Sequence, residues 1–115
     1  MNIAEYKTIK RILGLKADHI EDTKRPAYTM GSDDVLANFK RVAESSGMTP
    51  AQCCLVYMLK HVDSVSSYIK NPDIPQAESI LGRFADLHNY VCLCLALLVE
   101  ENDSLLKGED DDECV

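Results

Sequence analysis

The chain has 115 residues, with 12 lysines and arginines against 19 aspartates and glutamates, which gives a formal net charge of −7. A chain of this length forms one domain, and its 46% of hydrophobic residues is an ordinary share for a globular protein. A protein that binds long nucleic acids needs a basic face to displace counterions, so this charge argues against that class.

The acidity is concentrated at the C-terminus. Residues 107–115 carry five acids and one base, which leaves 14 acids and 11 bases over residues 1–106, a net of −3. The C-terminal segment has no hydrophobic periodicity, so we expect one helical domain over 1–106 and a disordered acidic tail over 107–115. The nearly balanced body leaves room for a small anion in a local basic pocket.

The cysteine pattern indicates a reducing compartment. The five cysteines are odd in number, and Cys53, Cys54, Cys92 and Cys94 lie in apolar helical segments. We therefore expect buried free thiols in a cytoplasmic protein, in the cytoplasm of a host cell, with no metal site because the zinc-ligand spacing is missing. The apolar run from Tyr90 to Val99 is too short to span a membrane, and no signal peptide precedes it.

The N-terminal part predicts a helix followed by a connector. Over residues 2–15, apolar side chains recur at helical spacing with basic ones opposite. From Lys16 to Gly31 the periodicity is lost, and Pro26 and Gly31 lie within that stretch. We therefore predict a helix over 2–15 and a long connector over 16–31.

Two further helices have clear boundaries. Ser32-Asp33-Asp34 offers N-cap side chains for a helix over 33–46, which Gly47 ends. Thr49, Pro50 and Gln52 form a capping-box pattern, which predicts a third helix from Thr49 to Lys70. Asn71-Pro72 stops this helix.

The fourth helix is expected from Glu78 to Asp103. Its main apolar stripe consists of Ile80, Phe84, Leu87, Val91, Leu95 and Leu98, and between Tyr90 and Val99 the other sides are apolar too. A helix that is apolar on every side must be covered on every side, and in a small chain the natural cover is another subunit. We therefore predict an all-α fold, a small bundle of about four helices that forms a homo-oligomer, dimer or higher, through this C-terminal helix.

Polar side chains also recur at helical spacing on the last two helices. Lys60 and Ser64 are four residues apart on the third helix, with His61 on the adjacent apolar row. On the fourth helix, one face carries Arg83, Asp86, Asn89 and Tyr90. Singly, these residues are explained by a surface ion pair between Arg83 and Asp86, a solvated Lys60 and a core histidine.

Together, these residues favour a ligand site. The polar face of the fourth helix directly precedes its most apolar segment, where unpartnered polar groups are costly. Lys60 and Arg83, with Lys24 or Arg25, can supply cations for phosphates, and Asn38 can join the same pocket.

Two segments, 31–65 and 78–101, resemble a group of small phage-encoded proteins. The matching motifs are Asn38-Phe39-Lys40, Thr49-Pro50, Lys60-His61, Ser64 and Asp86-x-x-Asn89-Tyr90, in that order. The helix order and the last motif are also similar to the all-α, MazG-like nucleoside triphosphate pyrophosphohydrolases and to phage domains associated with nucleotide modification. This resemblance implies a helical oligomer that binds a nucleotide between helices, with Mg²⁺ held by paired acids.

The chain departs from that acidic motif. The third helix offers Asp63, with Lys60 and His61 where acids are expected, and the fourth offers Glu78 and Asp86, eight residues apart. Eight residues of helix rise about 12 Å, so these two carboxylates do not form an i, i+3 pair. Lysine and histidine in place of acids suit direct binding of a phosphate without a metal.

Three functions remain open at this point. The first is a phage-type protein that binds a small nucleotide without catalysis and without a cofactor, and that counters host defence by sequestering a signalling nucleotide. Its ligand residues would be Asn38, Lys60, His61, Ser64, Arg83, Asp86, Asn89 and Tyr90. The second is a Mg²⁺-dependent pyrophosphohydrolase with Asp86, Asp63 and Glu78 as metal ligands. The third is a structural oligomer in which the polar row is an interhelical network.

Overall fold

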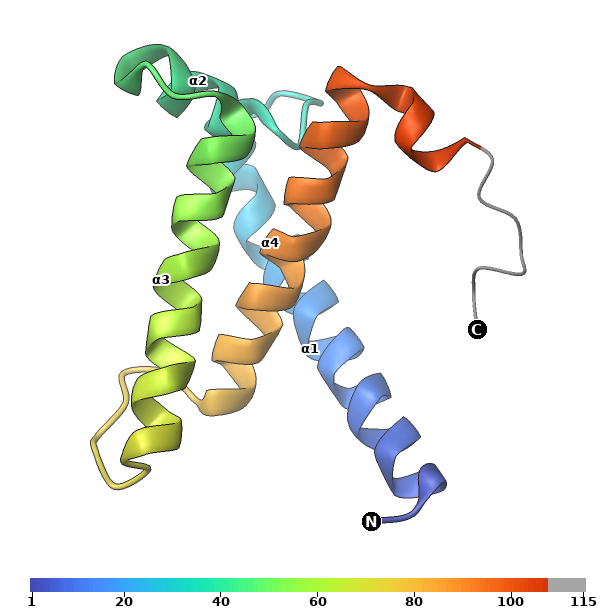
Figure 1. Cartoon of the computed structure of the whole chain (residues 1–115), viewed down its shortest axis with the longest axis vertical. Helices are drawn as coiled ribbons and strands as arrows, with labels where there is room; N and C mark the ends of the chain where they lie inside the picture. The colour runs from blue at the N-terminus through green and yellow to red at the C-terminus, as the bar shows by residue number, and fades with distance from the viewer. Residues whose placement is uncertain (108–115) are drawn as a thin grey trace.

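The computed structural model describes residues 1–107, whose regular elements are all helices, without a β-strand (Figure 1). Its elements are α1 (Ile3–Thr29), α2 (Ala37–Ser46), α3 (Pro50–Lys70), α4 (Ile80–Glu101) and a short 3-10 helix, η1 (Asp103–Leu106). The predicted all-α class with four helices is confirmed. The predicted acidic tail lies outside the described residues from position 108 onward.

The helices α3 and α4 form an antiparallel pair, and α1 crosses behind α4 (Figure 1). The short helix α2 closes the end of the pair where α3 begins and α4 ends. The N-terminal half of α1 diverges from α4 and projects away from the rest of the molecule. These crossings bring the C-terminal half of α1 beside both α2 and α4.

The predicted connector over residues 16–31 is wrong, because α1 continues without a break to Thr29. Pro26 lies inside the helix, where its missing N–H leaves one carbonyl of the preceding turn without its helical partner. The helix survives because Ala17, at the start of the supposed connector, and Thr29, near its end, are buried. It ends one turn after the proline, where Met30 adopts a left-handed conformation with φ of 53°.

Local capping explains most helix boundaries. At the start of α3 the predicted capping box is confirmed: the Gln52 amide donates to Thr49 Oγ1 at 3.1 Å, and the Thr49 amide donates to Gln52 Oε1 at 2.8 Å. The helix α4 begins slightly later than predicted, with Ser79 as its N-cap.

The predicted start of α2 is wrong by one turn. The Asp34 carboxylate accepts a hydrogen bond from the Leu36 amide at 2.9 Å, which forms a local turn in place of helix. Lys40 then joins α2 to its surroundings, since its Nζ lies 2.6 Å from both Asp34 Oδ2 and Glu100 Oε1. The hydrogen bonds that Lys40 donates to these carboxylates raise its pKa above the usual value.

The core lies where α2, α3 and the C-terminal half of α4 meet. Its buried members are Leu36, Phe39, Ala43, Cys53, Cys54 and Leu97. The ring of Phe39 makes edge contacts with Tyr57 and Tyr90, at centroid distances of 6.1 and 6.2 Å. This core is small, and much of the apolar stripe of α4 stays exposed, including Phe84, Val91, Leu95 and Leu98.

By length and composition alone, α4 is apolar enough to cross a membrane. The core helix of a soluble protein meets the same criterion. In the structure α4 carries a buried carboxylate, Asp86, and packs against α1 and α3. Packing within the chain accounts for only part of its apolar character, since 22% of its most apolar window is buried.

Replacing Leu97 by alanine should lower the free energy of unfolding by about 2–5 kcal/mol, because this side chain is 3% exposed and its loss leaves a cavity in the core. Leu106 is a matched control, since it lies in η1 and is 56% exposed. Leu106→Ala should change stability by less than about 0.5 kcal/mol. Urea unfolding followed by circular dichroism measures both, and equal effects would contradict the proposed core.

Candidate functional site

A cavity of about 100 Å³ lies between α1, α2 and α4. Its polar lining residues are Glu21, Lys24, Arg25, Thr29, Asn38, Asp86 and Asn89. Its apolar and aromatic lining includes Ile20, Tyr28, Phe39, Tyr90 and Leu93. Three helices that are distant in sequence therefore contribute polar groups and aromatic rings to one concave site.

The most buried charge at this site is the Asp86 carboxylate, which is 5% exposed. Lys24 Nζ lies 3.4 Å from Asp86 Oδ1, and the lysine side chain is 43% exposed. The carboxylate is thus neutralised from α1 by a cation at the rim of the cavity. Arg25, next to it in α1, contacts Glu21 and Asp22 of its own helix at 3.2 and 3.1 Å.

The two asparagines have one half of each amide engaged. Asn89 Nδ2 donates to the Ala17 carbonyl oxygen at 2.8 Å, which joins α4 to α1. Asn38 Oδ1 accepts from Arg41 Nη2 at 2.7 Å. Asn89 therefore keeps its amide oxygen as an acceptor, and Asn38 keeps its NH₂ group as a donor.

Aromatic rings support the α4 side of the cavity. Tyr90 is stacked between His61, at a centroid distance of 5.0 Å, and Tyr57, at 5.8 Å. Burial raises the pKa of Tyr90 well above its usual value, so the phenol stays protonated and can donate a hydrogen bond. These contacts hold the Tyr90 ring in one orientation beside the cavity.

Behind Tyr90, a histidine and an arginine each bury an unpartnered nitrogen. In the part of the chain that the structure describes, His61 Nδ1 and Arg83 Nε are buried without a hydrogen-bond partner. Burial lowers the pKa of His61, an effect that the Asp86 charge opposes and the Arg83 charge reinforces. His61 is therefore favoured in its neutral form.

The structure brings together half of the residues expected at a ligand site. Asn38, Asp86, Asn89 and Tyr90 line the cavity. His61 does not line the cavity, but it stacks on Tyr90, which does. The α3 residues Lys60 and Ser64 are not among the lining residues. The Ser64 hydroxyl instead donates to the Lys60 carbonyl at 3.3 Å.

The expected surface ion pair between Arg83 and Asp86 is wrong. Arg83 Nη1 lies 3.8 Å from Glu78 Oε2, and Asp86 pairs with Lys24. Both residues lie on α4 three positions apart, but Asp86 turns toward α1 because a cation on that helix can reach it. Asp86 pairs with Lys24 because α1 crosses α4 at this point. The spacing of residues along α4 alone does not predict this pair.

Sequence reasoning missed Ile20, Tyr28 and Phe39 as cavity residues. Ile20 and Tyr28 lie in the stretch interpreted as a connector, an interpretation that leaves out their helical spacing with Lys24. The four-residue steps from Ile20 to Lys24 to Tyr28 were the available signal. Extending the helical pattern past Lys16 places the side chains of Ile20, Lys24 and Tyr28 on one face of α1.

The cysteines and acids do not gather into a metal site within residues 1–107, where no three His, Cys, Asp or Glu side chains are placed to hold an ion. Cys53 and Cys54 are buried as expected, and burial raises the pKa of Cys54 to about 12. Cys92 is exposed, so the expectation of buried thiols is wrong for this residue. On α4 it lines a groove with Leu95, Val99 and Leu106.

Comparisons with family models, with curated proteins and with solved structures returned no match. The resemblance to phage proteins and to MazG-like enzymes therefore depends on the sequence motifs described above.

Stability should fall as the pH drops from 7.5 to 5.5. The pKa of His61 is lower in the folded protein than its ordinary 6.5, so the unfolded chain takes up this proton first as the pH falls. The free energy of unfolding has its full value above about pH 6.5 and declines below that pH. His61→Gln should reduce this pH dependence in urea unfolding, whereas His19→Gln, on the exposed surface of α1, should leave it in place.

If His61→Gln retained the full wild-type pH dependence, another group would be responsible. Any loss of stability that is equal at both pH values reports the lost stacking on Tyr90 and does not bear on the titration.

Proposed function

We propose that the protein binds a small nucleotide in the cavity between α1, α2 and α4, without hydrolysing it. The observation that supports this proposal is a cavity lined with aromatic rings, whose polar lining includes Lys24, Asn38, Asp86 and Asn89. Apolar cavities with a few placed polar groups are typical of ligand sites.

The cavity volume of about 100 Å³ is smaller than that of engineered apolar cavities, about 150 Å³, that hold benzene. The cavity can therefore take one edge of a base, and the rest of the base, the sugar and the phosphates would lie outside it. Lys24 and Arg25, each about two-fifths exposed, are the cations on that side.

The polar lining matches the edge of a base with an exocyclic amino group. The Asp86 carboxylate and the Asn89 amide oxygen can accept hydrogen bonds, and the Asn38 amide can donate one. A donor from the base would also compensate the Asp86 charge when a phosphate draws Lys24 away from it. Stacking on an aromatic side chain contributes about 1–3 kcal/mol per base.

The resemblance to small phage-encoded proteins supports a version in which the ligand is a signalling nucleotide, sequestered to counter host defence. Against the hydrolase alternative, Asp63, Glu78 and Asp86 are not grouped to hold Mg²⁺ in the described structure, and Glu78 pairs with Arg83. Binding without a metal therefore has the better structural support.

Titration calorimetry with AMP, ADP, ATP and cyclic AMP, in EDTA, tests this proposal. Lys24→Gln should weaken the binding of a nucleotide about 10-fold by removing one phosphate cation. Lys60→Gln is the matched control, since it removes the same charge from an exposed position on α3 outside the cavity. Circular dichroism of each variant verifies that the fold is retained.

A cavity-filling variant gives an independent check. Val35 lines the cavity and is 48% exposed, so Val35→Trp should occlude the site without disturbing the core and should abolish binding. Equal weakening by Lys24→Gln and Lys60→Gln, unchanged binding to Val35→Trp, or recovery of cleaved nucleotide in the presence of Mg²⁺ would each contradict the proposal.

A further inference from the structure

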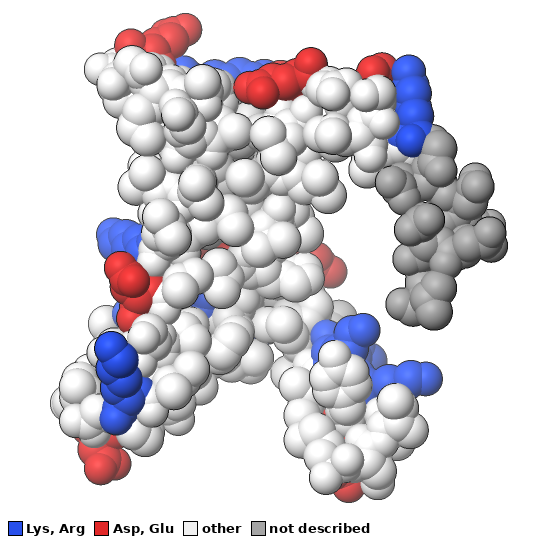
Figure 2. Space-filling model, viewed as in Figure 1, with Lys and Arg blue, Asp and Glu red and all other residues white. Residues whose placement is uncertain are grey.

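The side of the molecule opposite α1 exposes an apolar surface that spans α3 and α4. Figure 2, viewed with these two helices in front, shows an uncharged central surface over both of them. Its large exposed side chains are Leu55, Leu59, Val62 and Ile69 from α3 and Leu81, Phe84, Val91, Leu95 and Leu98 from α4. We call this set the apolar face.

The apolar face has the periodicity of a helix–helix interface. On α4 the exposed positions 81, 84, 88, 91, 95 and 98 follow one another in steps of three and four. On α3 positions 55, 59, 62, 66 and 69 follow the same steps. Alternating steps of three and four place side chains on a seam that faces another helix. Neither seam contains a charged residue, and His88 and Ser66 are their polar members.

The apolar face is also large for an uncovered surface. Its nine side chains are between 37% and 70% exposed, which amounts to several hundred Å² of apolar area. Exposed apolar patches above roughly 400 Å² generally mark an interaction site, and a stable interface buries about 800 Å² on each partner. A second pair of helices with the same seams supplies an area of this size.

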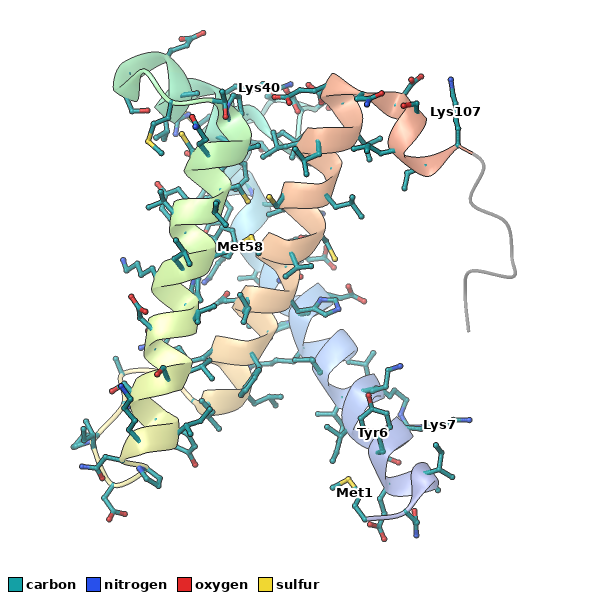
Figure 3. The ribbon with its side chains drawn as sticks, in the orientation of Figure 1. Met1, Tyr6, Lys7, Lys40, Met58 and Lys107 are labelled. Carbon is teal, nitrogen blue, oxygen red and sulfur yellow. The ribbon has the colours of Figure 1, made fainter. Side chains whose placement is uncertain are left out.

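A second unpartnered element points to a copy of this chain as the occupant. Residues 3–16 of α1, which we call the arm, extend clear of the other helices, as the positions of Tyr6 and Lys7 show (Figure 3). Ile3, Tyr6 and Ile9 form an exposed apolar stripe along it. No residue of the arm is buried, so its apolar stripe is free to contact a partner.

Charge favours pairing of the arm with another copy. The arm carries four bases and one acid, a net of +3, whereas residues 17–107 carry eight bases and 13 acids, a net of −5. Opposite net charges on two parts of one chain attract in an intermolecular contact and steer their encounter.

We propose that two copies of this chain form a symmetric dimer in which their apolar faces pack together and each arm lies against the other copy. The two faces are the same surface on both copies, as a two-fold interface requires. The interface does not include the polar residues of the nucleotide cavity, which lie among α1, α2 and α4. The dimer therefore does not depend on the proposed nucleotide function.

Sedimentation equilibrium of the full chain without nucleotide tests the dimer. The wild-type protein should have twice the monomer mass of 12.8 kDa. Leu59→Lys and Leu95→Lys place an unpaired charge in the apolar face and should each weaken the dimer by at least about 100-fold. Because both leucines are about half exposed in the single chain, the helical circular dichroism should be unchanged. Ser45→Lys, on the exposed side of α2, is the matched control and should remain dimeric.

The arm has its own variant. Ile9→Asp interrupts the apolar stripe and lowers the positive charge of the arm, so it should weaken the dimer about 10-fold. An unchanged dissociation constant would overturn the assignment of the arm to the interface.

Other results would overturn the proposal as a whole. A wild-type monomer at 100 µM would do so, as would a dimer that persists in Leu59→Lys and Leu95→Lys. A monomer that sediments with phosphatidylcholine vesicles would assign the apolar face to a lipid surface. Loss of nucleotide binding in a chain that still dimerises would instead contradict the proposed function alone.

Discussion

The close crossing of α1 over α4 is the contact on which the rest of the structure depends. Small buried residues, Ala17 on α1 and Ala85 on α4, let the two helices approach. Asn89 can then bond the Ala17 carbonyl at 2.8 Å, and one to two turns further along α1, Lys24 meets Asp86. The same crossing opens the cavity beside α2 and directs the arm away from the bundle.

This arrangement divides the molecule into two chemically different sides. Polar groups from α1, α2 and α4 meet at the cavity, where the Asp86 carboxylate and the Asn89 amide have their partners on α1. On the other side, α3 and α4 present aliphatic residues to solvent, while the core itself contains few large side chains. A 115-residue chain that leaves this much apolar surface uncovered gains stability when a second copy covers it.

The accuracy of the sequence predictions varied with the range of the interactions involved. The capping box at Thr49 and Gln52 acts within one turn, and the predicted start of α3 is confirmed. Pro26 is an equally local signal, but packing of Ala17 against α4 outweighs it, so the predicted connector is wrong. Asn38, Asp86, Asn89 and Tyr90 line one cavity as grouped from their spacing, whereas Lys60 and Ser64 do not line it.

The sequence by itself determined the all-α class, the number of helices and the position of most of their ends, because caps and apolar periodicity act over a few residues. It also placed Asp86 and Asn89 on one face of a helix. Only the tertiary structure decided that Lys24, and not Arg83, neutralises Asp86. That choice depends on the distance between α1 and α4 at their crossing, which small side chains far apart in the sequence set together.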